Sequence, residues 1–138
     1  IESLLKRPSI RLSEAHEDDL TDKQCLIVDS FGLLSSIYRY GDIAYIGGGF
    51  GAGIHNTLEA AVYGVPVLFG PRYHKFKEAK DLIAVGGGFS LSDAKAFRAK
   101  MDELLANREA LEASGKASGS FVKNNVGATD KVLNELTL

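Results

Sequence analysis

One stretch, AYIGGGFGAGIHNTLEAAVYGVPVLFGP from Ala44 to Pro71, constrains the fold of this chain more than any other. Its pattern predicts a strand over Ala44–Ile46, a glycine-rich loop over Gly47–Gly53, a helix that opens near Asn56 and closes at Gly64, and a second strand over Pro66–Phe69. Strand, loop, helix and strand in this order form a βαβ unit, in which the two strands run parallel.

The rest of the chain continues the alternation. Strands are predicted over Ser9–Glu14, Cys25–Val28 and Phe89–Leu91, and helices over Gly32–Tyr40, Phe76–Val85 and from Ser92 or Asp93 to Ala106. From Asn107 onward the pattern is helical, with expected interruptions at Gly115, Gly119 and Gly127. These elements predict an α/β fold, a parallel sheet with helices on both faces.

Composition narrows the class of protein. The 138 residues are 45% hydrophobic and 25% charged, which predicts a single globular domain over residues 1–138. The net charge is −2, so the chain lacks the overall positive charge that is typical of nucleic-acid-binding proteins. The lone Cys25 allows no disulfide within the chain and is expected to be a buried free thiol. No apolar run approaches the roughly 18 residues of a membrane span, and the first residues do not have the pattern of a signal peptide.

The beginning of the chain predicts a piece of a longer protein. Ile1 opens the segment IESLLKR, which has the pattern of a helix end without a cap and has no initiator Met. We therefore expect the domain to be truncated at its N-terminus.

The glycine loop is the first candidate site. Five glycines within Gly47–Gly53 allow unusual backbone angles and the close approach of a ligand. The amide groups at the start of the following helix favour an anion, so we expect a phosphate here. A simple turn between strand and helix is the alternative. The loop does not complete the G-x-G-x-x-G pattern with its later acidic residue, which argues against NAD.

Asn56 and Glu59 allow two interpretations. As N-x-x-E they form a capping box, with Asn56 accepting from the Glu59 amide and Glu59 reaching back, and on the residues alone this is favoured. Alternatively, the Glu59 carboxylate accepts both hydroxyls of a ribose. His55 lies either near a bound phosphate or in a packing role.

Other polar residues are weaker candidates. The segment after Pro71 is basic, with Arg72, His74, Lys75, Lys77 and Lys80, and His74 is a possible contact for a phosphate or a sugar carboxylate. His16 is expected in solvent. Asp29-Ser30 follows a strand and is expected to cap the next helix. The spacing of acids and histidines predicts no metal site.

A known family shares this set of motifs. The run D-S-F-G-L-L-x(3)-Y, the turn A-Y-I-G-G-G, then H-N-x-L-E-A-A, G-V-P-V-L-F-G-P and K-F-K together resemble the C-terminal half of bacterial 3-deoxy-D-manno-octulosonic acid (Kdo) transferase, roughly over Asp29–Asp93. Two departures are visible. Leu33 stands where the family has a glutamate, and the loop Gly47–His55 is about one residue shorter.

The resemblance implies the Rossmann-like C-terminal domain of a GT-B glycosyltransferase that moves Kdo from CMP-Kdo to a lipid A precursor. The family inverts the anomeric centre and needs no metal or cofactor. The resemblance places seven residues of this chain around the donor: Gly32, Leu33, Gly48, Gly49, His55, Asn56 and Glu59. Gly32 and Leu33 would lie beside the nucleotide, Gly48 and Gly49 would shape the phosphate turn, Asn56 would face the phosphate, and Glu59 would hold the ribose.

The resemblance also implies what this chain lacks. The catalytic glutamate and the lipid-binding surface of the family belong to an N-terminal acceptor domain, so we expect no catalytic residue here and no transfer by this piece alone. The complete enzyme would act at the cytoplasmic face of the inner membrane. Two alternatives remain open, a GT-B glycosyltransferase or epimerase that uses a UDP-sugar, and a non-catalytic Rossmann-like interaction domain.

Overall fold

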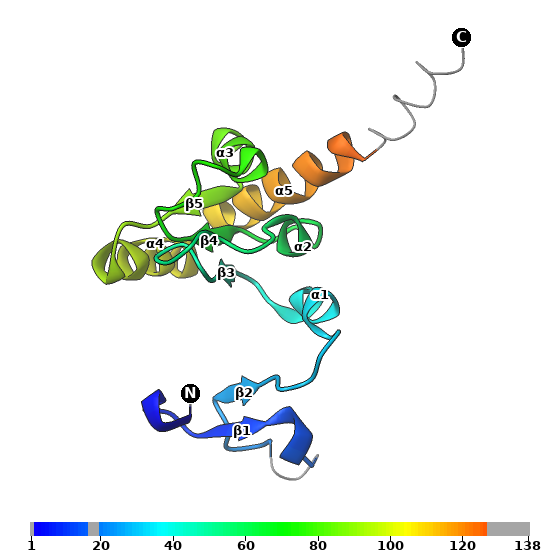
Figure 1. The fold of residues 1–138 in the computed structure, drawn as a ribbon, viewed down its shortest axis with the longest axis vertical. Coiled ribbons are helices and arrows are strands. Elements are labelled where there is room, and N and C mark those ends of the chain that lie inside the picture. The colour runs from blue at the N-terminus through cyan, green and yellow to red at the C-terminus, as the bar shows by residue number, and fades with distance from the viewer. Residues whose placement is uncertain (1, 17–19, 127–138) are drawn as a thin grey trace. The chain divides into compact units, whose positions relative to one another are not determined.

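The computed structural model describes residues 2–16 and 20–126 (Figure 1). The chain forms two compact units, the first ending at Ile37 and the second beginning at Tyr38. We describe each unit by itself, and the expectation of one domain over residues 1–138 stays a prediction.

The first unit contains two short parallel strands, β1 (Ser9–Arg11) and β2 (Cys25–Ile27), in which Ser9 pairs with Cys25. Short 3-10 turns cover Glu2–Leu4 and Leu12–Glu14, and helix α1 covers Leu34–Ile37. The predicted strand Ser9–Glu14 is therefore too long, because its second half turns. The predicted helix Gly32–Tyr40 is also wrong in extent: α1 is one turn long, and a 3-10 turn follows at Tyr38–Tyr40 in the second unit.

Two side chains of the first unit differ from expectation. Cys25 is a free thiol but only partly buried, and its neighbour Leu26 exposes 46% of its surface, so β2 lacks the expected cover on both faces. Asp29 does not cap a helix. Its carboxylate accepts from the amide of Ser13 at 3.1 Å and from the Ser13 hydroxyl at 2.5 Å, and the hydroxyl contact is the main reason that the pKa of Asp29 is lowered.

The second unit is a three-stranded parallel sheet in the order β3 (Ala44–Ile46), β4 (Val67–Phe69), β5 (Gly88–Ser90). Helices α2 (Leu58–Ala61), α3 (Lys77–Ala84), α4 (Ala94–Ala106) and α5 (Arg108–Asn125) alternate with and follow the strands (Figure 1). The βαβ prediction is confirmed. Strand β5 begins one residue earlier than predicted. Asp93 caps α4 as expected, since its carboxylate accepts from the Ala96 amide at 2.8 Å.

Helices cover both faces of this sheet, as predicted. Side chains of β4 alternate between two separate clusters. Val67 and Phe69 belong to a cluster with Ala61 of α2 and Leu82 of α3. Leu68, between them, belongs to a second cluster with Leu104 of α4. All three residues of β4 are fully buried, as a central parallel strand requires.

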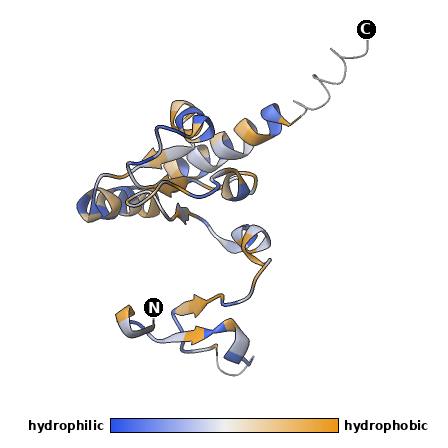
Figure 2. Ribbon diagram, in the orientation of Figure 1, coloured by the Kyte–Doolittle hydropathy of each residue, from blue (hydrophilic) through white to orange (hydrophobic). Residues whose placement is uncertain are grey.

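Helix α5 runs without interruption through two glycines that were expected to break it. Gly115 packs so closely on the turn after α2 that a Cβ there would lie 2.3 Å from the Gly64 carbonyl oxygen, and a Cβ at Gly119 would lie 3.2 Å from the Gly64 Cα. Ser118 donates to the Gly87 carbonyl at 2.9 Å on the same side. The middle of α5 is drawn in pale colours of intermediate hydropathy (Figure 2). The small residues Gly115, Ser118 and Gly119 therefore form the surface of α5 that packs against the turns at Gly64 and Gly87. Gly127 lies outside the described residues.

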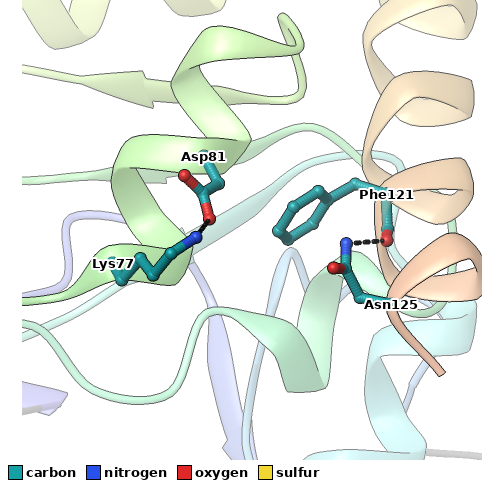
Figure 3. A network of polar contacts seen from close by, with 4 residues as sticks. All are labelled: Lys77, Asp81, Phe121 and Asn125. Carbon is teal, nitrogen blue, oxygen red and sulfur yellow. Dashed lines mark hydrogen bonds and ion pairs between the residues drawn. The ribbon is translucent and has the colours of Figure 1, made fainter. Parts of the chain in front are cut away.

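Helices α3 and α5 also meet at their ends. Figure 3 shows the ring of Phe121 pointing from α5 toward α3, where an ion pair joins Lys77 and Asp81, and Phe121 packs on the core cluster. Asn125 donates to the Phe121 carbonyl at 2.7 Å in the last turn of α5. Helix α3 faces the core with one side, because Ala79 and Leu82 are fully buried and Ile83 packs against the same cluster.

Candidate functional site

The glycine loop after β3 folds back on itself. The amides of Gly51 and Gly53 both donate to the Gly48 carbonyl, at 2.9 and 3.2 Å. Gly48 has a φ of +87°, and a Cβ at this position would lie 2.1 Å from the Gly53 carbonyl oxygen. Only glycine fits these two constraints together. The loop is therefore a turn with a defined shape.

The loop is fixed to the segment that follows β4. A Cβ at Gly49 would lie 2.5 Å from the Gly70 nitrogen, so the two backbones touch. Arg72 makes two further links: its amide donates to the Gly49 carbonyl at 3.0 Å, and its guanidinium donates to the Gly51 carbonyl at 2.7 Å. The carboxyl ends of β3 and β4 thus carry loops that support each other, at the edge where open parallel sheets bind ligands.

Helix α2 is shorter than predicted and is capped differently. It begins at Leu58 and ends at Ala61. The side-chain Oδ1 of Asn56 accepts from the Leu58 amide at 3.0 Å, and the Asn56 side-chain Nδ2 donates to a Glu59 carboxylate oxygen at 3.1 Å. The predicted capping box, with its bonds to the amides of Glu59 and Asn56, is therefore wrong. Glu59 is not the cap: it is held by the Asn56 side chain.

Two neighbours of Glu59 were not singled out as site residues. Tyr38 packs on the core, and its pKa is raised first by burial and then by the charge of Glu59. Tyr38 is the final residue of the D-S-F-G-L-L-x(3)-Y run, which was the available signal. Thr57 is 1% exposed, and its hydroxyl has no hydrogen-bond partner within the part of the chain that the structure describes. No pattern in the sequence predicts that.

His55 is exposed and lies over the loop. Its amide donates to the Gly47 carbonyl at 3.2 Å, and a Cβ at Gly48 would lie 3.3 Å from the Cδ2 atom of its imidazole. The ring therefore borders the turn in which a phosphate was predicted. The structure brings five of the seven predicted site residues into one region of the second unit: Gly48, Gly49, His55, Asn56 and Glu59.

The other two predicted residues lie in the first unit. Gly32 has a φ of +82° with no atom within 4 Å of where a Cβ would stand, and Leu33 exposes 40% of its surface. Both follow β2 and precede α1. Their predicted place beside a nucleotide stays a prediction.

The basic segment borders a cavity of about 330 Å³. Its lining consists of Ala52 from the glycine loop and Arg72, His74, Lys75 and Phe76 from the segment after β4. The His74 ring stacks on Tyr73 with centroids 4.3 Å apart. Phe76 is the N-cap of α3, and no side-chain hydrogen bond caps that helix. The cavity therefore combines cationic side chains with an uncapped helix start.

Metal-binding clusters and membrane-spanning helices are both absent from the described residues. No group of three His, Cys, Asp or Glu side chains there is arranged to hold a metal ion. None of the helices in residues 2–16 and 20–126 has the length and apolar character needed to cross a membrane.

Sequence comparison finds curated relatives with a common description. The 3-deoxy-D-manno-octulosonic acid transferase of Aquifex aeolicus is 35% identical over 94 residues, which cover 67% of this chain and 27% of that protein. The Kdo transferase of Haemophilus influenzae is 30% identical and covers 99% of this chain and 33% of its own length. The chain thus spans about a quarter to a third of these relatives. No protein-family model matches it.

The fold leads to the same family. A crystal structure of the C-terminal CMP-Kdo binding domain of WaaA from Acinetobacter baumannii matches with a TM-score of 0.72 and 27% sequence identity, over 84% of this chain and 61% of that one. The α/β fold that the sequence predicts is confirmed. The resemblance in the sequence is confirmed as well, and the chain is a relative of the Kdo transferases that corresponds to their C-terminal domain.

Proposed function

We propose that this chain is the part of a Kdo transferase that binds the donor, CMP-Kdo, for transfer of Kdo to a lipid A precursor. The observation that carries the proposal is the match in fold and sequence to the C-terminal CMP-Kdo binding domain of WaaA. The curated relatives support the reaction class, because they are described as Kdo transferases.

The geometry supports a division of roles within the second unit. The turn at Gly48 and Gly49 and the neighbouring imidazole of His55 form the wall for the phosphate of CMP. Glu59 accepts one hydrogen bond from Asn56, and its carboxylate has capacity for further donors. Two adjacent ribose hydroxyls are suitable donors for such a group, since a carboxylate accepts both. In this proposal Asn56 orients Glu59 and faces the phosphate.

The proposed reaction is a direct displacement at the anomeric carbon. An acceptor hydroxyl attacks, a carboxylate outside this chain accepts its proton, and the C–O bond to CMP breaks with inversion. This domain stabilises the departing phosphate through backbone amides and cationic side chains, without a metal ion or a further cofactor. In this proposal the complete enzyme works at the cytoplasmic face of the inner membrane, and this chain alone binds the donor but does not transfer sugar.

An amide NMR titration of this chain tests the proposal. CMP, UMP and NAD are added in parallel, and shifts confined to CMP over the Gly47–Glu59 segment are expected. Equal shifts with UMP would favour a UDP-sugar enzyme of the same architecture. No response to any nucleotide would contradict the donor-binding role and favour an interaction domain.

Glu59→Ala separates ribose binding from a purely structural role. The bond between the Leu58 amide and Asn56 stays in place, so the melting temperature should change little. Loss of charge-assisted bonds, worth roughly 1.5–3 kcal/mol, should weaken CMP binding about 10- to 100-fold. Glu78→Ala is the matched control, because Glu78 is also a partly buried acid in the first turn of a helix. Equal CMP affinity in all three proteins would contradict the role of Glu59.

A further inference from the structure

The cavity beside the glycine loop has the chemistry of an anion site. Of the five residues that line it, Arg72 and Lys75 carry positive charge and none is acidic. His74 adds an imidazole, fixed by its stacking on Tyr73. Phe76 marks the start of α3, a helix of eight residues without a side-chain cap, and the positive end of such a helix also favours an anion. Two independent features therefore favour negative charge at the same place.

The cavity is built into the loop that is proposed to hold the phosphate. Ala52, one of its walls, lies inside the loop Gly47–Gly53, and the Arg72 guanidinium is bound to the Gly51 carbonyl at 2.7 Å. A Cβ at Gly53 would lie 3.1 Å from the Phe76 ring, so the loop and the start of α3 are in contact on this side too. The glycine turn and the cavity therefore share one wall, and a single extended ligand can reach both.

The donor CMP-Kdo has two anionic groups that are candidates for binding in this cavity. One is the phosphate that joins the sugar to CMP, and the other is the carboxylate of Kdo, which is an acid by its chemical name. Both offer negatively charged oxygens to Arg72, His74 and Lys75. The turn at Gly48 already provides a place for the phosphate. The cavity has a volume of about 330 Å³, which is more than a single phosphate group needs and is suitable for a sugar with its carboxylate.

We propose that this cavity, formed by Ala52, Arg72, His74, Lys75 and Phe76, receives the carboxylate of the Kdo sugar while CMP lies on the glycine turn and Glu59. This inference rests on the proposed function. It assigns to the basic segment the recognition of an acidic sugar, in addition to the nucleotide contacts. Lys75 is the direct partner to test, because the Arg72 guanidinium also holds the loop.

Lys75→Met tests the assignment, because methionine keeps an unbranched side chain and removes the charge. The affinities of the 138-residue chain for CMP-Kdo and for CMP are measured by calorimetry. CMP-Kdo binding should weaken about three- to tenfold, a modest value because Lys75 is exposed. CMP binding should be unchanged. Lys80→Met is the matched control, since Lys80 is an exposed lysine that does not line the cavity.

If Lys75 contacts the phosphate instead of the carboxylate, the affinities of Lys75→Met for CMP and CMP-Kdo change in the opposite way. Free CMP carries more negative charge on its phosphate than CMP-Kdo does, because the sugar esterifies that group. If Lys75 binds phosphate, the variant weakens CMP at least as much as CMP-Kdo, and the carboxylate assignment is overturned. Unchanged affinity for both ligands also overturns it. Failure of the unaltered chain to bind CMP is a separate result, which contradicts the proposed function itself and this inference with it.

Discussion

Glycine serves two different purposes in this protein. In the loop after β3, Gly48 adopts a φ of +87° and closes a turn. In the middle of α5, Gly115 and Gly119 lie within a continuous helix, where they allow the helix to approach the turn at Gly64. The first kind of glycine allows a tight turn, which we propose as the phosphate site, and the second brings two backbones together in the interior. The same residue type therefore indicates a loop in one place and helix packing in the other.

Gly48→Ala is expected to have the largest effect. The added Cβ meets the Gly53 carbonyl oxygen at 2.1 Å, and the positive φ is itself unfavourable for alanine. Strain of about 1–3 kcal/mol from the backbone and a similar amount from the clash should rearrange the loop and abolish CMP binding. Thermal denaturation measures the loss of stability, and the CMP titration measures the loss of binding. The control is Gly86→Ala, where φ is +80° but no atom lies within 4 Å, and there the titration should be unaffected. Equal CMP binding by all three proteins would contradict the role of the turn.

Gly115→Ala should destabilise the fold by about 1–2 kcal/mol. The Cβ would lie 2.3 Å from the Gly64 carbonyl oxygen, and an approach this close to a backbone atom belongs to the upper part of the overpacking range, about 2–3 kcal/mol. Alanine has a better helix propensity than glycine and stabilises the helix by roughly 1 kcal/mol, which lowers the net loss of stability. Denaturant unfolding measures the change. A more stable variant would mean that α5 does not pack against Gly64, and the comparison of the two kinds of glycine would fail.

Gly119→Ala should have the smallest effect, within about 0.5 kcal/mol of the unaltered chain. Its Cβ would lie 3.2 Å from the Gly64 Cα, so a small shift of α5 relieves the contact, and the gain in helix propensity offsets the remaining cost. The same unfolding experiment tests the ranking. A loss as large as that of Gly115→Ala would show that this part of α5 cannot move.

Local patterns were sufficient for much of the fold. The strand at Ala44–Ile46, the helix over Lys77–Ala84 and the Asp93 cap of α4 all depend on residues close in sequence, and all were predicted within a residue or so. The observed order β3-β4-β5 agrees with the general tendency of consecutive parallel strands joined by helices to be neighbours. The candidate site region could be proposed from the sequence as well, since the glycine loop and the H-N-x-L-E run are adjacent in the chain, and its role stays a prediction.

The side-chain partners were not available from the sequence. Asn56 and Glu59 have the spacing of a capping box, and nothing local distinguishes it from the bond between their side chains that the structure contains. Asp29 follows a strand and suggested a helix cap, yet its carboxylate binds Ser13, which is 16 residues earlier. The charge of Glu59 also contributes to the raised pKa of Tyr38, a residue well separated from it in the chain.

The sequence by itself determined the α/β class, the βαβ unit around the glycine loop and the family, because hydrophobic periodicity and short motifs are properties of neighbouring residues. Only the tertiary structure decided what the glycines of α5 do, and that Arg72 ties two loops together beside a basic cavity. Each of these depends on contact between segments far apart in the chain. Such contacts form only when the core packs, so no local pattern records them.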